Sequence, residues 1–353
     1  MAKASRTTIR AIASALNVSP GTVSRSLREY PGVHPEMRQR VRAMAESMGY
    51  IVRGEGARQR RGDGHRLKIV VVVGDTIVLH AGAVDTTYVT YHFLSGLSQA
   101  ANELDAVLSV AFVNASSLNE SADPQRELGI IGDVDGIVLI YPLPERFVAR
   151  LVKLTNVVSL EHAYPTLPVD VVGPAQAVDV MRAVERLQQL GHRRIAYTAD
   201  DAARGNRLPQ TLRFAGYLSA LRRGGLEYRP EDAIGIPGPS VPQTELAAAV
   251  AARARKDVTA VVCSTDRQAY LLMKELAAHK VRVPQKLSII GIGGVTPIEG
   301  LPQLTMYRTP YETLGRAAIA RLRERQHHPG GSPVLKEYPS TFIEGTSVAP
   351  PRN

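Results

Sequence analysis

The 353-residue sequence contains a single cysteine, Cys263, and no long apolar segment. One cysteine excludes a disulfide framework and is compatible with a reducing compartment. Cys263 stands in the apolar run "VTAVVCSTD", which favours a small buried strand residue over a catalytic thiol. The sequence has no run of about 18 apolar residues and its first residues form no apolar signal core. We therefore expect a cytoplasmic protein without a membrane partner.

Patterns that would indicate catalysis are also missing. No spacing of Cys, His and carboxylate residues resembles a metal site. No nucleophile, general base and orienting group occur at a sequence spacing that indicates a catalytic site. The glycine-rich stretch "GIGGVTPIEG" follows a late strand and leads into Pro and Gly rather than into a helix, so it is a weak dinucleotide-binding signal. We predict no catalytic residues, no metal site, no cofactor and no enzymatic activity.

Positive charge is concentrated near the N-terminus. The net charge is +10, and residues 1–66 hold 13 Lys and Arg against 5 Asp and Glu, whereas the remainder holds 30 against 28. A basic segment of this kind suits a polyanion, because neutralising phosphates releases counterions. The alternative is a basic tail surrounded by solvent.

The first fifty residues carry the pattern of three short helices. Apolar residues recur at i, i+3, i+4 and i+7 from Ile9 to Leu16, and Thr8 is a candidate cap. Ser19 is a favoured N-cap and Pro20 a favoured first helical residue, so Pro20-Gly21 is predicted to begin the second helix. A third helix is predicted from Pro35, ending near Gly49.

Two helices separated by a tight turn, followed by a third, predict a helix-turn-helix unit. The second helix of such a unit enters the DNA major groove with its N-terminal end leading. Ser24, Arg25 and Arg28 would then face the nucleic acid, where arginine makes bidentate contacts to guanine or pairs with phosphate.

The segment "TIRAIASALNVSPGTVSRSLREYPGVHPEMRQRVRAMAESMGY" resembles the DNA-binding headpiece of the lactose-repressor (LacI) family, above all in "VSPGTVSRSL" and the terminal "GY". In that family much of the operator is read at the two positions after Ser19, where this chain has Pro20 and Gly21. Direct readout is therefore expected to shift to Ser24, Arg25 and Arg28, with Pro20 making apolar contact to a thymine methyl group. The DNA-binding residues implied by the resemblance are Thr8, Ser19, Pro20, Gly21, Thr22, Ser24, Arg25, Arg28, Tyr50, Arg58 and Arg60.

Residues 51–66, "IVRGEGARQRRGDGHR", form a predicted basic linker without a hydrophobic pattern. The family has a Pro-Asn pair and a hinge helix here, whose leucine wedges into the minor groove. This chain has Val52-Arg53 and, near the leucine position, Gln59 or Arg60. Leucine insertion is therefore not expected, and the arginines either read a narrow minor groove or, as we favour, bind phosphates.

From Leu67 onward, Val- and Ile-rich runs alternate with amphipathic segments in two successive series. Such alternation predicts parallel sheets covered on both faces, and two series predict two doubly wound α/β lobes with a cleft at the carboxyl ends of the strands. We expect a helix-turn-helix headpiece at 1–50, a hinge at 51–66, and a domain at 67–353 for effector binding and dimerisation. Lobe 1 is predicted at about 67–165 plus 300–325 and lobe 2 at about 166–299 plus 326–348.

The stretches "QLGHRRIAY", "LRFAGYLSAL", "VRVPQKLSIIGIGG" and "LPQLTMYRTPYETLGRAA" are similar to the periplasmic-binding-protein-like core of LacI-type regulators. In that core the chain crosses between the lobes three times, so the segment near Tyr307 to Arg325 is expected to return to lobe 1. Arg213 is the residue with which the family holds polar groups of the effector, although a surface salt bridge is the competing interpretation. The effector-binding residues implied by position are Thr90 and Tyr91 before the first helix of the core, Tyr141, Glu161, Arg213, Thr265 and Asp266.

Two departures from the family pattern bear on the ligand. The family's "V-G-x-D-N" is replaced by residues 172–176, "VGPAQ", and its "G-[FY]-D-[DN]" by residues 291–294, "GIGG". Acidic residues that commonly bind sugar hydroxyls are absent from both. With Arg213 retained, a sugar derivative or an anionic metabolite is favoured over a simple neutral sugar. The competing hypothesis is a weakened pocket that binds little.

These features predict a transcriptional regulator, most simply a repressor, that binds a pseudo-palindromic operator in double-stranded DNA as a homodimer. One headpiece reads few base pairs, and two related by two-fold symmetry multiply specificity. The protein is expected at the nucleoid when it is bound to DNA. An activator or a ligand-independent DNA binder is the main alternative. A solute-binding protein is a weaker one, because it predicts a secretion signal and no basic headpiece.

Overall fold

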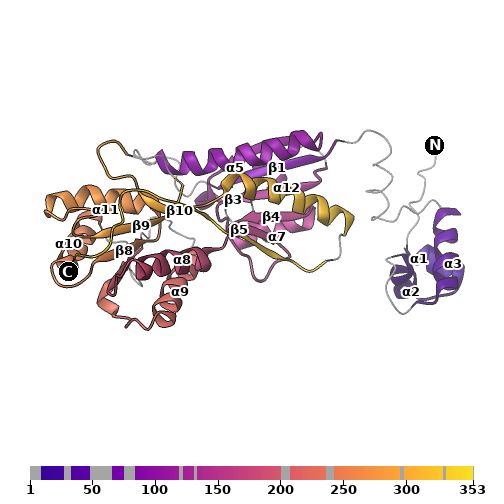
Figure 1. Ribbon diagram of the computed structural model, residues 1–353. Coiled ribbons are helices and arrows are strands. Elements are labelled where there is room, and N and C mark those ends of the chain that lie inside the picture. Colours follow the sequence, from indigo (N-terminus) through magenta and orange to yellow (C-terminus); the bar gives the residue numbers. More distant parts are fainter. Residues whose placement is uncertain are drawn as a thin grey trace. The chain divides into compact units, whose positions relative to one another are not determined.

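The computed structural model describes residues 9–27, 33–47, 66–74, 84–118, 122–130, 133–199, 207–235, 242–294, 298–328 and 331–352. The chain divides into two compact units, Met1–Arg66 and Leu67–Asn353. Each unit is described below on its own (Figure 1).

The first unit contains three helices, α1 (Ile9–Leu16), α2 (Pro20–Leu27) and α3 (Pro35–Ser47). Each contributes apolar side chains to one small core, which is why three helices of 8 to 13 residues remain folded together. The buried members of this core are Ile12, Ala13, Val23, Val41 and Ala45.

The second unit contains two six-stranded sheets within the described residues. The first sheet has the strand order β11-β5-β4-β3-β1-β2, and with its helices it forms lobe 1. Its strands are β1 (Lys68–Gly74), β2 (Val107–Val113), β3 (Gly136–Ile140), β4 (Val157–Leu160), β5 (Asp170–Pro174) and β11 (Leu335–Tyr338), and its helices are α5 (Val84–Glu103), α6 (Pro124–Glu127), α7 (Glu145–Leu154) and α12 (Tyr311–His327).

The second sheet has the order β12-β10-β9-β8-β6-β7 and belongs to lobe 2. All neighbouring strands of both sheets run parallel except β12, which is antiparallel to β10. The strands of lobe 2 are β6 (Ile195–Thr198), β7 (Ala233–Ile234), β8 (Ala260–Cys263), β9 (Ser288–Gly293), β10 (Thr305–Arg308) and β12 (Thr341–Ile343), and its helices are α8 (Gln176–Gln189), α9 (Arg207–Arg223), α10 (Gln243–Ala254) and α11 (Asp266–Ala278).

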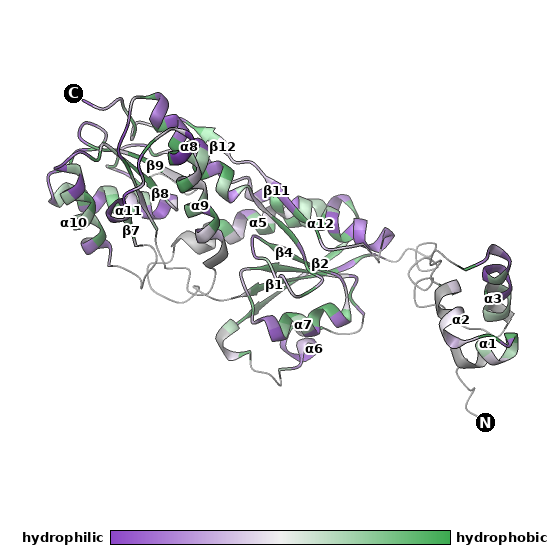
Figure 2. Cartoon of the chain, turned by 90° about the horizontal axis from the view of Figure 1, so that it is seen from below, coloured by the Kyte–Doolittle hydropathy of each residue, from purple (hydrophilic) through white to green (hydrophobic). Residues whose placement is uncertain are grey.

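Helices cover both faces of each sheet, which confirms the predicted doubly wound architecture. In β1, Ile69, Val71 and Val73 pack toward α5 and α12, whereas Val70 and Val72 pack toward α7. In lobe 2, α8 and α9 cover one face and α10 and α11 the other. The sheets accordingly contain the most hydrophobic stretches of the chain (Figure 2). Strands buried on both faces explain the continuous Val and Ile runs in the sequence.

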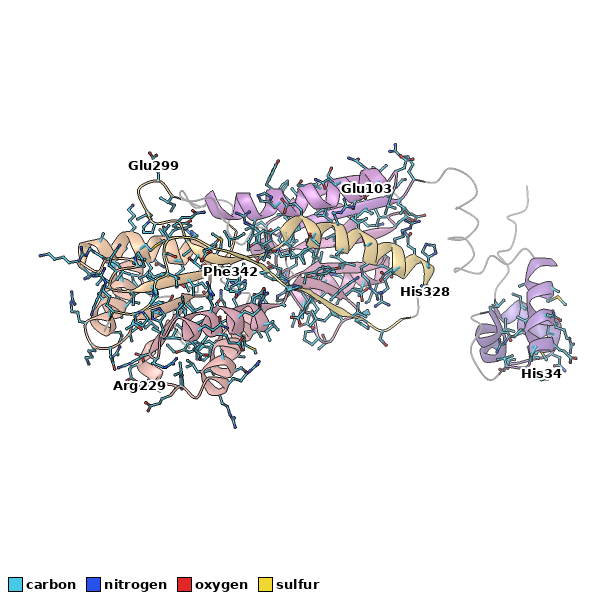
Figure 3. The ribbon with its side chains drawn as sticks, viewed as in Figure 1. His34, Glu103, Arg229, Glu299, His328 and Phe342 are labelled. Atoms are coloured by element: carbon cyan, nitrogen blue, oxygen red, sulfur yellow. The ribbon has the colours of Figure 1, made fainter. Side chains whose placement is uncertain are left out.

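Helices α5 and α12 are far apart in sequence but lie side by side on lobe 1 (Figure 1). Their close approach depends on glycine, because a Cβ at Gly96 would collide with the backbone of Glu312 and one at Gly315 with the backbone of Phe93. The two helices are also joined by Arg316, which donates two hydrogen bonds of 2.8 Å to Glu103. Glu103, the last residue of α5, is labelled in Figure 3.

The chain passes between the lobes three times: between β5 and α8, between β10 and α12, and between β11 and β12. The predicted lobe boundaries therefore need correction. Strand β5 belongs to lobe 1 and not to lobe 2, because it pairs with β4. Strand β10 pairs with β9 in lobe 2, so the return to lobe 1 begins at α12 and not at Tyr307. Strand β11 pairs with β5 and lies in lobe 1.

Candidate functional sites

The N-terminal end of α2 is formed as its cap chemistry predicts. The hydroxyl of Ser19 accepts a hydrogen bond from the backbone N–H of Thr22 at 3.0 Å and lies 2.9 Å from the Thr22 hydroxyl. Asn17 takes a left-handed conformation in the turn before it, with φ of 52°. Pro20 is the first helical residue, so Pro20-Gly21 begins the helix and does not break one.

The inner side of α2 is fixed by Val23 and Ser26, both fully buried. The Ser26 hydroxyl donates to the backbone carbonyl of Thr22 at 2.8 Å, which satisfies it inside the small core. By the helical repeat, positions 21 and 25 lie on the opposite side of α2. Gly21 is exposed, and an added Cβ there would meet only the Ser19 hydroxyl at 3.6 Å. Packing against the described residues of the headpiece therefore gives no reason for glycine at this position.

The structure describes part of the predicted DNA-binding set. Ser19, Pro20, Gly21 and Thr22 form the beginning of α2, and Ser24 and Arg25 lie in the same helix. The remaining predicted residues lie outside the described part of the chain: Thr8, Arg28, Tyr50, Arg58 and Arg60.

In lobe 1, two candidate effector residues stand directly after neighbouring strands. Tyr141 follows β3 and Glu161 follows β4, with φ of 69° and 65°. Left-handed conformations at non-glycine residues cost about 1–3 kcal/mol each, and they cluster at functional sites. The hydroxyl groups of Tyr141 and Thr90 lie 2.9 Å apart, which brings α5 to this group.

The placement of Thr90 and Tyr91 differs from the prediction in one respect. Both lie inside α5, which begins at Val84, and not before it. Tyr91 is 66% exposed and packs edge-on against His92. The structure thus brings Thr90, but not Tyr91, to the other candidate residues.

Lobe 2 contributes Arg213, which is only 8% exposed. Its Nη1 donates to the backbone carbonyl of Ser264 at 2.6 Å, and its Nε donates to Oε1 of Gln176. The interpretation of Arg213 as a surface salt bridge is therefore wrong, since the side chain is buried. It lies beside the strand ends because α9 packs closely on α8, where Gly216 leaves room for the backbone of Ala177.

Thr265 and Asp266 begin α11 directly after β8. Thr265 is the N-cap, and its hydroxyl accepts from the backbone N–H of Gln268 at 3.2 Å. The carboxylate of Asp266 accepts from the backbone N–H groups of Arg267, at 2.8 Å, and of Gly294. A Cβ at Gly293 would collide with this carboxylate. The carboxylate of Asp266 therefore occupies the space that a side chain at position 293 would enter.

Charge couples these residues across the two lobes. Burial raises the pKa of Glu161, and the positive charge of Arg213 partly opposes this rise. Burial also raises the pKa of Tyr311, the first residue of α12, and the carboxylates of Glu161 and Asp266 raise it further. We name the group Thr90, Tyr141, Glu161, Gln176, Arg213, Asp266 and Tyr311 the interlobe cluster.

Sequence reasoning missed two members of the interlobe cluster. Gln176 is the first residue of α8, directly after the first passage between the lobes, and Tyr311 is the first residue after the second. Their position in the sequence could have revealed them, because each lies just after a strand at whose end the chain passes to the other lobe. That signal was hidden by the wrong lobe boundaries.

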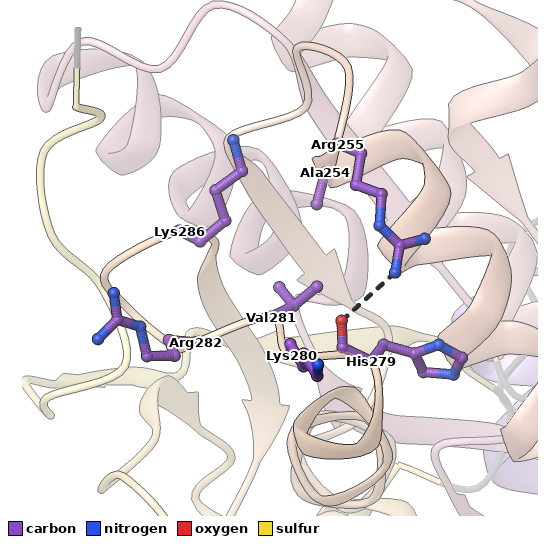
Figure 4. A pocket seen from close by; sticks show the side chains of 7 residues that line it. All are labelled: Ala254, Arg255, His279, Lys280, Val281, Arg282 and Lys286. Atoms are coloured by element: carbon purple, nitrogen blue, oxygen red, sulfur yellow. Dashed lines mark hydrogen bonds between the residues drawn. The ribbon is translucent and has the colours of Figure 1, made fainter.

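A separate basic pocket lies in lobe 2, with a volume of about 380 Å³ (Figure 4). It is situated where α10 and α11 end, and Arg255 donates to the carbonyl of His279 at 3.4 Å. Helix C-terminal ends favour nearby cations, so a structural role accounts for its charges. The lining residues are Ala254, Arg255, His279, Lys280, Val281, Arg282 and Lys286.

Within the part of the chain that the structure describes, no helix has the length and apolar character needed to cross a bilayer. The same residues contain no group of three or more His, Cys, Asp or Glu arranged to hold a metal ion.

Two family models match the chain. One, described as bacterial regulatory proteins, lacI family, matches residues 8–52. The other, described as a periplasmic binding protein-like domain, matches residues 184–348. The first contains the headpiece helices, and the second contains Arg213, Thr265 and Asp266.

Curated relatives are similar over nearly the whole length. The sucrose operon repressor of Escherichia coli is 24% identical over 328 residues, covering 90% of this chain and 93% of the relative. The transcriptional repressor CytR of Escherichia coli K12 is 23% identical and covers 93% of each chain. The transcriptional regulator CelR of Thermobifida fusca is 25% identical, and the match covers 92% of this chain and 93% of CelR.

Solved structures share the fold. A complex of the regulator CelR with cellobiose has a TM-score of 0.63 at 22% identity, covering 97% of this chain and all of the other. The lac repressor dimer bound to operator and an anti-inducer has a TM-score of 0.62 at 18% identity, covering 98% of this chain and 100% of the lac repressor chain.

Proposed function

Since this chain is a transcriptional regulator of the lacI family, we propose that it binds a pseudo-palindromic operator as a homodimer under the control of a small molecule held by the interlobe cluster. Repression is the proposed outcome, as in the sucrose operon repressor and CytR. The observation that carries the proposal is the presence, in one chain, of a capped helix-turn-helix unit and a two-lobed core with a buried arginine at the strand ends.

The DNA-binding role is supported by α2 and by charge. The exposed start of α2 presents Ser19, Pro20 and Gly21, and residues 1–66 carry most of the net positive charge. A helix N-terminus and nearby cations favour phosphate contacts, which give affinity and set the register on the duplex. Base readout is assigned to Ser24, Arg25 and Arg28. The other proposed contacts are Thr8, Thr22, Tyr50, Arg58 and Arg60.

The homodimer is supported by strand β2 at the edge of the lobe 1 sheet. This strand pairs only with β1 among the described strands, and it exposes Val107, Val110 and Phe112, the last to 66%. An exposed apolar edge strand is a ready template for association, and monomeric proteins usually protect such an edge. We propose that a second copy of the chain covers β2.

Effector control is supported by the position of the interlobe cluster. The cluster takes residues from both lobes, and the chain passes between the lobes beside it, at Gln176 and Tyr311. A ligand that binds one relative position of the lobes better than another shifts the balance between them, to the extent of its differential affinity. The candidate contacts are Thr90, Tyr141, Glu161, Arg213, Thr265 and Asp266, and the effector is a sugar derivative or an anionic metabolite.

An activator or a ligand-independent DNA binder uses the same headpiece, so it remains the alternative. A solute-binding protein is disfavoured by the helix-turn-helix unit. We assign the protein to the cytoplasm, at the nucleoid when it is bound to DNA, and assign it no enzymatic activity.

The test is selection of DNA from a random-sequence pool by the full-length protein, followed by footprinting on the genomic sites that match the selected sequence. Two inverted half-sites, protected by two copies of the chain, are expected. Protection that overlaps a promoter indicates repression, and protection upstream of it indicates activation. Failure to enrich any sequence would remove the proposed function.

A further inference from the structure

Arg213 is a buried cation without a counter-ion in contact. The guanidinium donates to a backbone carbonyl at 2.6 Å and to an amide oxygen, and no carboxylate of the described residues lies within ion-pair distance of it. The charge of Arg213 acts at longer range on the carboxyl groups of Glu161 and Asp179, and lowers the pKa of each against the effect of burial. A buried charge without an ion pair in contact is costly, and a partner that brings the opposite charge into contact recovers part of that cost.

Gln176, directly beside Arg213, is a buried donor without an acceptor. It is 4% exposed, and its Oε1 accepts from Arg213, which fixes the orientation of the amide. Its Nε2 then has no hydrogen-bond partner among the described residues. Native structures rarely leave such a group unpaired, and an orphaned amide donor calls for an acceptor.

The acceptors near Arg213 are already engaged or weakened. Both oxygens of Asp266 accept from backbone N–H groups, of Arg267 and of Gly294. Burial raises the pKa of the Glu161 carboxyl group, and the charge of Arg213 partly opposes this rise. Among the described residues, the Arg213 guanidinium and the Gln176 amide thus offer donors that no carboxylate contacts. A neutral polyol brings donors and acceptors in equal measure, whereas a carboxylate brings acceptors and a negative charge.

We infer that the effector carries a carboxylate, which the Arg213 guanidinium and the Gln176 amide N–H hold together. This inference rests on the proposed effector role of the interlobe cluster, and it adds Gln176 to the binding residues. A planar carboxylate matches the guanidinium fork, and the charge-assisted bonds it forms are stronger than those of a hydroxyl. A phosphate offers the same kind of oxygen with a tetrahedral shape, and the experiment separates the two.

The first arm measures thermal unfolding of the full-length protein in sodium acetate, sodium phosphate and sodium chloride at equal ionic strength, and with glucuronate against glucose. Acetate and glucuronate are expected to raise the melting temperature above chloride and glucose. A larger rise with phosphate than with acetate would replace the carboxylate by a phosphate and overturn the inference. No difference between acetate and chloride would overturn it as well.

The second arm requires no added ligand. Gln176→Glu places a carboxylate against Arg213 within the protein, so it is expected to raise the melting temperature and to abolish the response to acetate. Gln189→Glu, exposed at the other end of the same helix, adds equal charge and is expected to leave the response to acetate unchanged, while a negative charge at a helix C-terminal end lowers the melting temperature slightly. A lower melting temperature in Gln176→Glu than in Gln189→Glu would show that the site does not need an anion.

Arg213→Met is the complementary variant, because it removes the positive charge that the proposed carboxylate would bind. Replacing a buried charged group by an apolar one of similar volume is often neutral or stabilising, so this variant is expected to fold. Its melting temperature should no longer respond to acetate. Release of wild-type protein from that DNA by glucose as well as by glucuronate would overturn the carboxylate but leave the proposed function intact. Loss of DNA selection altogether would instead remove the proposed function, whatever the acetate response.

Discussion

Arg325 donates two hydrogen bonds to Asp170, from Nε to Oδ2 at 2.6 Å and from Nη2 to Oδ1 at 2.9 Å. The pair joins the last turns of α12 to the beginning of β5. Asp170, buried at 1% exposure, also accepts from Arg321 and from the backbone N–H of Val334 at 2.8 Å. One carboxylate therefore holds β5, α12 and the segment leading into β11 in the same lobe.

Asp170→Asn is expected to lower the free energy of unfolding of the core by about 3–5 kcal/mol, because it leaves the buried Arg325 without its charge partner. Urea unfolding at neutral pH measures this. Glu103→Gln breaks the exposed pair with Arg316 and is the control, since exposed pairs contribute little. Equal losses in the two variants would contradict the special role of Asp170.

The carboxylate of Asp170 also makes the free energy of unfolding depend on pH in the acid range. Burial alone would raise the pKa of Asp170, but hydrogen bonds from Arg325, Arg321 and Val334 outweigh burial and lower it. The contribution of Asp170 is then complete above the unfolded-state pKa of about 3.9 and is lost as the pH falls through the lower folded-state value. Asp170→Asn should remove this part of the acid-unfolding curve, and an unchanged curve would contradict it.

His192 predicts a second, milder dependence on pH. Its Nε2 lies 3.0 Å from the carbonyl of Ala349 and its Nδ1 2.8 Å from the Thr259 hydroxyl, an arrangement that suits the neutral ring. Burial lowers its pKa, so its contribution is complete above about 6.5 and is lost as the pH falls toward the folded-state value. The difference in unfolding free energy between wild type and His192→Gln should therefore shrink as the pH falls from 7 to 5. A constant difference would show that the ring does not titrate in this range.

The comparison of sequence with structure separates local from long-range determinants. Pro20 and Ser19 predicted the start of α2 because a helix cap is a local arrangement, and the apolar run of β1 predicted a strand buried on both faces. The lobe of β5 was predicted wrongly, because the sequence pattern does not show that this strand pairs with β4 or that Asp170 meets Arg325, 155 positions away. Helix α5 begins at Val84, within a stretch rich in Val and Thr whose propensity disfavours a helix. Its packing on α12 through Gly96 and Gly315 has no local sequence signal. The pairing of Gln176 with Arg213 is likewise long-range.

Phe112→Lys is expected to convert the proposed homodimer into a monomer with an intact fold, because it places charge on the exposed apolar edge strand β2. Sedimentation measures the mass, and circular dichroism measures the fold. The control is Leu335→Lys. Leu335 is also apolar and is 62% exposed, and it lies on β11, the edge strand at the other side of the same sheet. Dissociation by Leu335→Lys, with Phe112→Lys still dimeric, would move the interface to the opposite edge.

Arg25→Ala is expected to cost about 1–3 kcal/mol in specific DNA binding and to flatten base preference at one position of each half-site, if Arg25 reads a base. Binding of full-length protein to the selected site and to single-base variants measures both effects. An equal loss on every DNA sequence, with a smaller salt dependence, would instead identify Arg25 as a phosphate contact.

Gly21→Ala separates the folding of the headpiece from its recognition of DNA. Among the described residues, an added Cβ meets only the Ser19 hydroxyl, at 3.6 Å, so alanine fits and should stabilise α2 through its helix propensity, by less than the roughly 1 kcal/mol of a helix interior because Gly21 lies in the first turn. If glycine is present to let DNA approach the helix closely, the same variant should bind its selected operator more weakly while the headpiece becomes more stable. Hydrogen exchange of α2 in the full-length protein measures the first effect, and operator titration the second. Tighter or unchanged operator binding by the stabilised variant would mean that DNA does not approach at Gly21, and that readout begins further along α2, at Ser24 and Arg25.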